Sequence, residues 1–448
     1  MRHPLSRVTY AFNEAIQGRD TLYYFNELKK IRNYSEDELK VFQFERLKKL
    51  LVYACNHTDY YKKAFDKAGF DPANMTSFEN FQKTSLLTKS DIRNDATGFI
   101  ANDKKRKLTR YATSGSTGHP LIFYLSNERT AAAKAAYLVL YDWWGLGIGD
   151  REAVLWGSSR DISAYSIAKK IRDRLLNTHL LPAFAMGEKT MQKYIDFIRK
   201  YRPKDIFGYA HSIYILARFA KNRGVSLKDA GVKVIFTTAE ALHDFQRELI
   251  QEAFGCPVAN CYGGRESGLI AFECPAGGMH LNPNIITEIV KDGVPVKPGD
   301  KGEIVITDLD SYGMPFIRYR TGDEGILSAK PCACGRTSAV MEKVLGRNTD
   351  YVVNAKGEFI HPLALEYIFR ELAGVDYFKI TQKKEDKLVI DLVVNQKFDK
   401  SLERHIKDKV CQAMNGPVDV DIRFIKEDEI DQGDKYKFVV SEVIGKYI

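Results

Sequence analysis

The sequence predicts an α/β fold in two parts: a large amino-terminal domain with layers of mixed sheets and helices, and a small α+β carboxy-terminal domain. Segments typical of strands and helices alternate from about residue 110 to 345, which favours a layered α/β core. A second set of helices and strands follows residue 346 and has the length of a small domain. The 448 residues, 44% of them hydrophobic, supply enough core for both parts.

The first hundred residues are expected to be mainly helical. Apolar side chains recur at helical spacing between residues 36 and 70, for example Leu39, Phe42, Leu47 and Leu50. We therefore expect the large domain, residues 1–346, to begin with a helical region over about residues 1–100.

Elements in the rest of the chain follow from local patterns. In the large domain, strands are predicted at 154–156, 205–207, 232–236, 258–261, 285–290 and 303–307, and helices at 190–201, 211–222 and 241–254. In the small domain, residues 351–448, helices are predicted at 363–372 and 401–414, and strands at 377–382, 387–394 and 418–424.

Charge and composition exclude several classes of protein. The net charge of +9 is spread along the chain, whereas nucleic-acid binding more often shows a concentrated basic stripe, so we expect phosphorylated small molecules as partners and no nucleic acid. The amino terminus has no apolar run of signal-peptide length, and no transmembrane segment is expected, so a cytoplasmic location is predicted. Seven cysteines in such a chain do not indicate a disulfide framework.

A hydroxyl-rich and glycine-rich loop at residues 112–120 is the most informative motif. Glycine lets backbone N–H groups approach an anion, and hydroxyl groups add donors without bulk, so the loop is suited to phosphate. The apolar run 121–125 follows at once and predicts a strand, so the loop is expected to cap a hairpin or strand pair. His119 and Pro120 follow the last glycine, where a Walker-type site requires lysine and Ser or Thr.

Four further motifs follow in order. Residues 260–268 form a glycine-rich bend with an aromatic ring and a carboxylate, and residues 319–323 place Asp323 in a predicted tight turn. Residues 346–350 lie at the predicted domain boundary, and residues 433–437 near the carboxyl end. Their order and spacing resemble the adenylate-forming superfamily of acyl-CoA synthetases and amino-acid adenylation domains. Segments 155–157, 207–212 and 332–336 resemble its phenylacetate-CoA ligase-like group, and in particular the capsular polysaccharide biosynthesis branch.

The resemblance implies an ATP site assembled from these motifs. The phosphate loop would hold the β- and γ-phosphates, Ala239 and Glu240 would line the adenine, and Tyr262 would stack on the base beside Gly263. Asp323 would bind the ribose hydroxyls. The phosphate-loop residues are Thr113, Ser114, Gly115, Ser116, Thr117 and Gly118.

Three residues are implied to be catalytic. Glu266 would bind Mg²⁺, Arg347 would reach the ribose or phosphate, and Lys435 would act in the first half-reaction. Residues 347–350 would form a hinge on which the small domain moves, so that a second nucleophile reaches the acyl-adenylate. Asp434 stands where the family has glycine, which leaves Lys437 as a rival to Lys435.

Arg265 is a second departure from the family, which usually has Ser or Thr at this position. The arginine can contact phosphate or pair with a structural carboxylate. The acid-binding pocket is expected near the start of the 211–222 helix, with candidates Tyr141, Tyr209, His211 and Ser212, together with Trp143 and Trp144 unless these tryptophans are core.

A structural zinc site is predicted from three cysteines and one histidine. Cys332 and Cys334 share a tight loop, and Cys274 and His280 lie upstream. Three thiolates and an imidazole complete a closed tetrahedral site. The alternative is that the cysteines are reduced and bind no metal.

The predicted function is ATP-dependent activation of a carboxylic acid to an acyl-adenylate with release of pyrophosphate. The acyl group would then pass to an acceptor, in polysaccharide or cell-surface biosynthesis. Coenzyme A, a carrier or an amino sugar is the candidate acceptor, and an aryl- or acyl-CoA ligase is the alternative within this class. A non-catalytic ATP-binding regulatory protein is the alternative of another class, because Arg265 and Asp434 depart from the family pattern.

Overall fold

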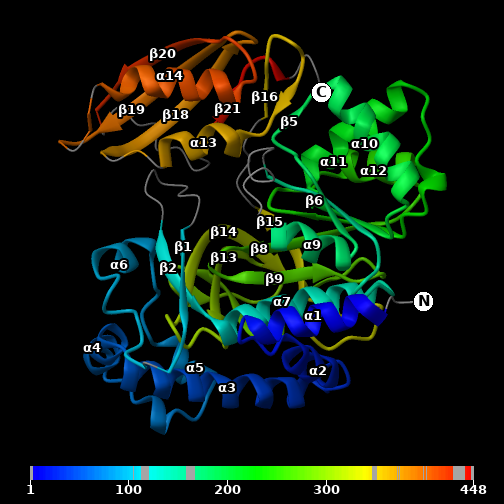
Figure 1. The fold of residues 1–448 in the computed structure, drawn as a ribbon. Helices are drawn as coiled ribbons and strands as arrows, with labels where there is room; N and C mark the ends of the chain where they lie inside the picture. The colour runs from blue at the N-terminus through cyan, green and yellow to red at the C-terminus, as the bar shows by residue number, and fades with distance from the viewer. Residues whose placement is uncertain are drawn as a thin grey trace. The chain divides into compact units, whose positions relative to one another are not determined.

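The structure is a computed structural model (Figure 1). It describes residues 4–103, 105–112, 121–157, 167–345, 351–370, 372, 374–396, 398–399, 401–426 and 439–444, with the backbone alone for residues 4, 167, 168, 185, 370, 376 and 377. Two compact units divide the chain. The first comprises residues 1–112, 121–150 and 259–346, and the second residues 113–120, 151–258 and 347–448.

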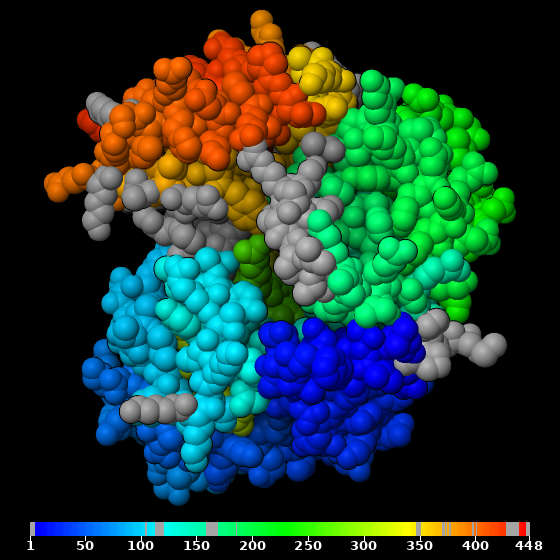
Figure 2. Space-filling view, viewed as in Figure 1, coloured from blue at the N-terminus to red at the C-terminus, as the bar shows by residue number. Residues whose placement is uncertain are grey.

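Helices dominate the amino-terminal part of the first unit, as predicted. In order they are α1 (Pro4–Ile16), α2 (Thr21–Ile31), α3 (Glu36–His57), α4 (Asp59–Ala68), the 3₁₀ turn η1 (Pro72–Asn74), α5 (Phe78–Gln82) and α6 (Lys89–Asn94), with α7 (Asn127–Trp143) further along. A capping box of Ser35 and Glu38 starts α3, and Gly69 in the left-handed region ends α4. Helix α1, dark blue in Figure 2, exposes the apolar residues Leu5, Val8, Phe12 and Ile16.

The first unit also holds an antiparallel sheet and a separate hairpin. The hairpin pairs β1 (Leu108–Ala112) with β2 (Ile122–Ser126), so the predicted phosphate loop joins two paired strands. The sheet strands run in the spatial order β12-β11-β13-β14-β15-β10-β9-β8. Their bounds are β8 (Val258–Gly264), β9 (Gly268–Glu273), β10 (Met279–Leu281), β11 (Ile285–Lys291), β12 (Val294–Pro295), β13 (Lys301–Asp308), β14 (Tyr319–Leu327) and β15 (Val340–Leu345).

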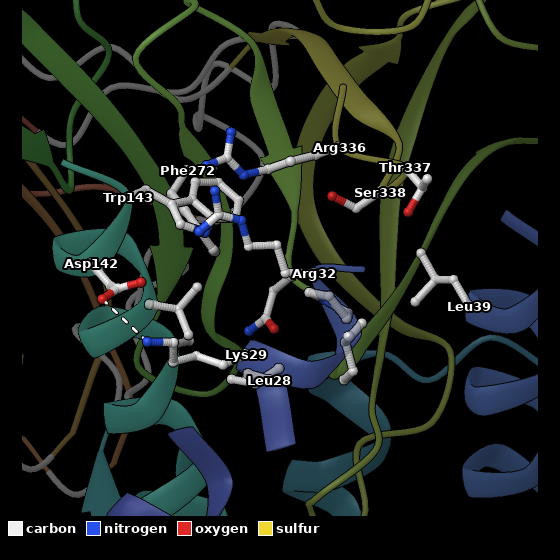
Figure 3. Close-up of a pocket in the computed structure, with 15 residues that line it drawn as sticks. Leu28, Lys29, Arg32, Leu39, Asp142, Trp143, Phe272, Arg336, Thr337 and Ser338 are labelled. Carbon is white, nitrogen blue, oxygen red and sulfur yellow. Dashed lines mark ion pairs between the residues drawn. The ribbon is translucent and has the colours of Figure 1, made fainter. Parts of the chain in front are cut away.

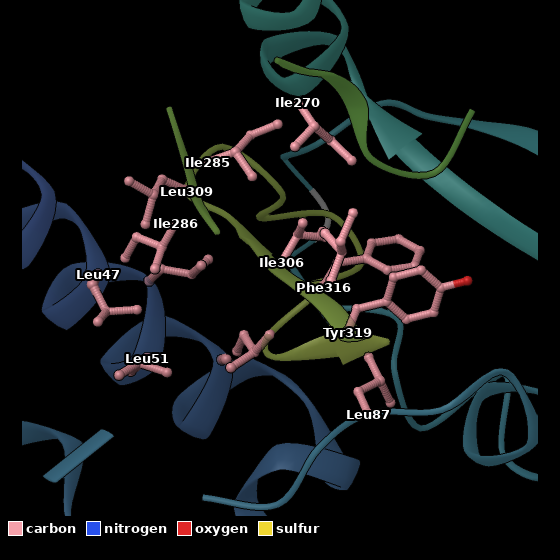
Figure 4. Close-up of a cluster of buried hydrophobic side chains, with 14 of the residues drawn as sticks. Leu47, Leu51, Leu87, Ile270, Ile285, Ile286, Ile306, Leu309, Phe316 and Tyr319 are labelled. Carbon is pink, nitrogen blue, oxygen red and sulfur yellow. The ribbon is translucent and has the colours of Figure 1, made fainter. Parts of the chain in front are cut away.

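A single hydrophobic cluster joins the helices and the sheet of the first unit. Leu47 and Leu51 from α3 meet Ile286 and Ile306 from the sheet, and all four are buried (Figure 4). Burying apolar side chains of this size contributes about 1.5–3 kcal/mol each. The helical region therefore anchors the strands that carry the predicted site residues of β8, β9 and β14.

The second unit has a parallel sheet with the strand order β7-β6-β3-β4. These strands are β3 (Glu152–Leu155), β4 (Thr178–Leu181), β6 (Asp205–Tyr209) and β7 (Val234–Thr238). The helices between them are α9 (Ile167–Leu175), α10 (Glu188–Tyr201) and α11 (Ala210–Asn222), with the 3₁₀ turn η2 (Lys228–Ala230), and α12 (Asp244–Phe254) follows β7. Every residue of β7 is buried, as expected of a central parallel strand with both faces covered.

The carboxy-terminal part of the second unit is an α+β group, as predicted. A sheet in the order β20-β19-β18-β21 packs with two helices. The elements are α13 (Pro362–Arg370), β18 (Val375–Lys384), β19 (Lys387–Val394), α14 (Leu402–Ala413), β20 (Asp419–Phe424) and β21 (Val439–Ser441). Before them, β16 (Val352–Val353) and β17 (Phe359–Ile360) form a small sheet with β5 (Ala185–Met186).

The predicted α/β class is confirmed, with two local differences. Asp323 lies within strand β14, not in a tight turn, because β13 and β14 stay paired on both sides of a bulge. Helix α12 begins at Asp244, three residues later than predicted. The hinge at 347–350 lies outside the described residues, so the moving small domain stays a prediction. Among the described helices, none has the length and apolar character needed to cross a membrane.

Candidate nucleotide and metal sites

Strand β8 and the turn that follows it carry two of the predicted nucleotide-binding residues, Tyr262 on the strand and Glu266 in the turn. The chain reverses at residues 265–267, and a Cβ atom at Gly263 would collide with the Gly268 carbonyl. Glycine is therefore required at this close approach of the two strands. Since β8 ends at Gly264 and β9 begins at Gly268, Glu266 lies in the turn between the two strands.

Strand β14 brings a second carboxylate to this turn. The Tyr262 hydroxyl donates to Asp323 Oδ2 at 3.0 Å, and the Tyr319 hydroxyl donates to Glu266 Oε1 at 3.1 Å. Burial and the nearby Asp323 charge raise the pKa of Tyr262 well above its ordinary value, so its phenol keeps its proton. One aromatic ring and two carboxylates from separate motifs thus lie together in the first unit.

A buried arginine fixes the backbone of the same turn. Arg129, in the first turn of α7, donates from Nε to Asp308 Oδ2 at 2.8 Å and from Nη2 to the Glu266 carbonyl at 2.9 Å. Its side chain is only about 5% exposed, so these charge-assisted bonds form away from water. Arg129 therefore positions the Glu266 backbone.

Arg265 connects the turn to the strand that leads into the phosphate loop. Its Nη1 donates to the carbonyl of Ala112, the last residue of β1, at 3.0 Å. The exposed guanidinium thus contacts a backbone oxygen one residue before Thr113. Residues 113–118, Arg347, Lys435 and Lys437 lie outside the described residues, and their roles stay predictions.

In the second unit, the predicted adenine-lining segment carries a buried ionic cluster. Ala239 has a positive φ of 68°, an uncommon backbone conformation for alanine, and Glu240 follows it. Glu240 Oε2 accepts the His211 backbone N–H at 3.0 Å, and its Oε1 lies 2.9 Å from His361 Nε2. Burial alone would raise the pKa of Glu240, but the contacts with His361 and His211 outweigh it and lower that pKa.

The histidines of this cluster are oriented by their neighbours. His361 Nδ1 accepts the Leu363 backbone N–H at 3.1 Å, which leaves the proton on Nε2, facing Glu240. Gln246 Nε2 lies 3.3 Å from His211 Nδ1 while Gln246 Oε1 accepts the His243 N–H, so Gln246 donates to His211. Burial lowers the pKa of His211 to about 4, so its ring is neutral at pH 7.

Two buried ring nitrogens of the cluster, His211 Nε2 and His361 Nε2, make no well-aligned hydrogen bond among the described residues, and only His361 Nε2 has the Glu240 carboxylate beside it. His211 Nε2 is buried and has no hydrogen-bond partner among the described residues, and the bond at Nδ1 makes it an N–H donor. Ser212 Oγ lies 2.9 Å from the hydroxyl of Tyr351, and Tyr209 stacks on Trp156 with ring centroids 4.1 Å apart. Ser212 and Tyr209 are thus engaged in internal contacts, whereas His211 keeps a free donor.

The candidate acid-pocket residues are divided between the two units. Tyr209, His211 and Ser212 gather at the start of α11, whereas Tyr141 lies on α7 in the first unit. Trp144 Nε1 donates to the Glu273 carbonyl at 3.0 Å. Trp143 packs against Phe272 with ring centroids 4.6 Å apart. Both tryptophans therefore have packing roles in the first unit.

The four predicted zinc ligands come together in the first unit. The ligand atoms of Cys274, His280, Cys332 and Cys334 all lie within 4.8 Å of one another. Cys274 Sγ and Cys332 Sγ are 3.7 Å apart, and His280 Nε2 lies 3.1 Å from Cys334 Sγ. These spacings suit one tetrahedral ion with Zn–S bonds of about 2.3 Å.

The surroundings of this cluster support its use as a metal site. The carbonyl of Ser338 lies 2.9 Å from His280 Nδ1, so Nδ1 carries the proton and Nε2 points at the thiols. A Cβ atom at Gly278 would lie 2.5 Å from Cys332 Sγ, so only glycine leaves room for that thiol. The residues present fit a closed, structural metal centre.

Sequence reasoning missed four residues of these clusters. Tyr319 and Arg129 orient Glu266, and His361 and Tyr351 contact the 211–240 cluster. Each of them contacts a residue that is distant in the sequence, so the local sequence pattern around it does not indicate the contact. The clearest available signal was the position of Tyr319 at the start of the Asp323 motif.

Comparisons with known proteins agree with this arrangement. Residues 352–442 match the CapK C-terminal domain. The chain is 24% identical over 435 residues to protein CapK of Staphylococcus aureus, covering 96% of this chain and 94% of that protein. It is 26% identical over 402 residues to phenylacetate-coenzyme A ligase of Thermus thermophilus, covering 84% and 86%.

A solved structure extends the agreement to the fold. The structure of 2-hydroxyisobutyryl-CoA ligase in complex with 2-HIB-AMP and CoA superposes with a TM-score of 0.64 at 19% identity, over 94% of this chain and 93% of that one. The comparisons therefore confirm the predicted resemblance: the chain is a relative of CapK and the phenylacetate-coenzyme A ligases with the fold of an adenylate-forming ligase.

Proposed function

We propose that this protein is an adenylate-forming ligase that uses ATP and Mg²⁺ to convert a carboxylic acid to an acyl-adenylate with release of pyrophosphate. The observation that carries the proposal is the grouping of Tyr262, Glu266 and Asp323, which come from two separate motifs and lie on β8, in the turn after it and on β14. Similarity to phenylacetate-coenzyme A ligase over most of the chain supports it.

The side chains of this group suit a nucleotide. The Tyr262 ring offers an aromatic face for the adenine, and the Asp323 carboxylate, which accepts from the Tyr262 hydroxyl, is the kind of acceptor that a ribose hydroxyl requires. Tyr319 holds one oxygen of Glu266 and leaves the other for a cation. Oxygen ligands of this kind are those that Mg²⁺ prefers, and the ion would offset charge on the triphosphate.

His211 is the candidate contact for the acid. Its buried Nε2–H has no partner among the described residues, and the neutral ring donates without adding charge. A substrate carboxylate oxygen would satisfy this donor. In this proposal Glu240 acts as a positioning residue, because its carboxylate holds the His211 backbone.

Coenzyme A is the acceptor that we favour. Relatives along most of the chain are named phenylacetate-coenzyme A ligases. A role in capsular polysaccharide synthesis, with an amino sugar or carrier as acceptor, is the second candidate and is supported by the similarity to protein CapK. We further propose that Cys274, His280, Cys332 and Cys334 hold a structural zinc ion, that residues 113–118 hold phosphate, and that residues 347–350 form a hinge.

One experiment tests the activity and the acceptor in sequence. The protein is incubated with ATP, Mg²⁺ and a panel of aryl and short-chain acids, and mass spectrometry detects the acyl-AMP. Coenzyme A or glucosamine is then added, and the consumption of acyl-AMP is followed. ATP binding without acyl-AMP for any acid would instead favour the non-catalytic regulatory protein.

A pair of lysine variants tests the proposed catalytic residue. We expect Lys435→Ala to lower acyl-AMP formation by about 100-fold or more, the scale for losing one preorganised group that stabilises developing charge. Lys437→Ala serves as the matched control and should keep near-normal activity. The reverse result would move the catalytic role to Lys437.

A further inference from the structure

A separate pocket lies in the first unit between α2, α7 and the strands that flank the metal cluster (Figure 3). Its empty space is about 560 Å³ when the open solvent at its mouth is counted, and about 40 Å³ has room for the centre of a water molecule. None of the proposed nucleotide-binding residues lines it. It uses the face of α7 that carries Ala136, Val139 and Trp143, whereas Tyr137 on another face of α7 interacts with Cys261 and Arg129.

The inner walls of this pocket are apolar. Helix α2 contributes Leu28 and Ile31, and α7 contributes Val139, all less than 10% exposed. Trp143 and Phe272 add two aromatic rings that pack against each other. Such walls favour the hydrocarbon or aryl part of a ligand.

The rim is cationic and only partly neutralised. Lys29 is paired with Asp142, with Nζ and Oδ1 3.5 Å apart (Figure 3). The Arg336 guanidinium lies over the Trp143 ring at 4.1 Å and hydrogen-bonds the Cys334 side chain, while its Nε is buried without a hydrogen-bond partner among the described residues. Arg32 lines the same pocket and forms no ion pair with any carboxylate in the described parts of the chain.

Two guanidinium groups therefore share an apolar pocket whose one carboxylate, Asp142, is already paired with Lys29. Figure 3 shows Arg32, at the carboxyl end of α2, and Arg336, in the segment after β14, among the residues that line the pocket. Guanidinium forks match the oxygens of carboxylates and phosphates, and a water-excluding wall beside them strengthens such bonds.

We propose that this pocket binds a small amphipathic anion: a carboxylate or phosphate head held by Arg32 and Arg336 on a short hydrocarbon or aryl body that lies against Leu28, Val139 and Trp143. The site is distinct from the acid-activating site and does not depend on the proposed ligase activity. The protein would thus bind a second ligand. The two arginines select its anionic head group, and the apolar side chains select its hydrocarbon or aryl body.

Calorimetric titration of the full chain with three probes tests the proposal. Octanoate and octyl phosphate carry a carboxylate and a phosphate head group on hydrocarbon chains of similar length. Octanol has a chain of the same kind but no charge, so it serves as the control. We expect at least one anion to bind at least tenfold more tightly than octanol, and the stronger of the two identifies the head group. Equal binding of octanol, or no binding of either anion, would overturn the proposal.

Variants tie the binding to this pocket and not to the acid-activating site. Arg32→Gln and Arg336→Gln should each weaken anion binding about tenfold, the scale of one charge-assisted hydrogen bond. Lys30→Gln, on the same helix and paired with Glu27, is the control and should bind normally. Arg32 is exposed, so its variant keeps the fold, and an unchanged circular dichroism melting curve verifies this. Normal binding by Arg32→Gln would refute the proposed site.

Discussion

Two glutamates from predicted ATP-site motifs have opposite surroundings in the two units. Glu266 in the first unit has one oxygen held by Tyr319, and its side chain is half-buried. Glu240 in the second unit has one oxygen on a backbone N–H and the other beside His361. The Glu266 carboxylate is oriented by one hydrogen bond and can still accept others. Both oxygens of the Glu240 carboxylate already contact groups of the protein.

The metal cluster extends this contrast. Three thiols and one imidazole converge in the first unit, and none of the cysteines is in a disulfide. In the second unit, the His211 backbone N–H and the His361 ring instead face one carboxylate, that of Glu240. The thiols and imidazole of the first unit thus suit a metal ion, whereas in the second unit the buried His211 Nε2 is left without a hydrogen-bond partner among the described residues.

Removing the proposed zinc ion should have the largest effect. Metal analysis of protein purified without added zinc should find about one equivalent per chain, and a strong chelator should lower the melting temperature, because a structural zinc site contributes directly to folding. Cys332→Ser should lose the metal, whereas Cys55→Ser, on α3, should retain it. A zinc content far below one equivalent in the unaltered protein would contradict this site.

Glu266→Gln should mainly affect activity. The amide keeps the Tyr319 contact but loses the charge that holds Mg²⁺, so we expect acyl-AMP formation to fall on the order of 100-fold. The melting temperature should stay the same. Glu324→Gln, on β14 and paired with Lys301 at the surface, is the control and should retain full activity. Normal activity of Glu266→Gln would remove Glu266 from the proposed magnesium site.

Glu240→Gln should mainly affect stability. One amide cannot accept from both His361 and the His211 backbone, so a buried donor loses its partner at a cost of about 1–3 kcal/mol. Chemical denaturation should show this loss, while acyl-AMP formation below the transition changes much less than in Glu266→Gln. A variant with unchanged stability and abolished activity would reverse the contrast between the two glutamates.

The pH dependence of stability should show a smaller effect. Burial lowers the pKa of His211 from 6.5 to about 4, so the unfolded chain binds the proton more readily between these values. The stability contributed by the neutral ring is complete above pH 6.5 and is lost as the pH falls towards 4. His211→Asn keeps the backbone N–H and should flatten this part of the stability curve. Parallel curves for both proteins would contradict the buried, neutral ring.

Ordered motifs predicted much of the candidate site. The glycine-rich bend and the Asp323 motif were expected to serve one nucleotide, and Tyr262 and Asp323 are in contact. The hairpin around the phosphate loop followed from an apolar run directly after it, and the four metal ligands followed from their residue types. Such features depend on local chemistry, which a sequence displays directly.

Other features could not be found this way. Arg129 resembles any helix-surface arginine until the fold places it against Asp308 and Glu266, and Asp323 resembles a turn residue until β13 and β14 pair around it. Arg32 and Arg336 are about 300 residues apart and share a pocket only because α2 packs near the metal loop.

The sequence by itself determined the fold class, the order of its motifs and the kinds of side chain available for nucleotide and metal, because periodicity and residue chemistry are local. Tertiary structure alone decided which of those side chains make hydrogen bonds or ion pairs within the protein and which can still donate to or accept from a ligand. The physical reason is that burial and pairing depend on neighbours brought together from distant parts of the chain.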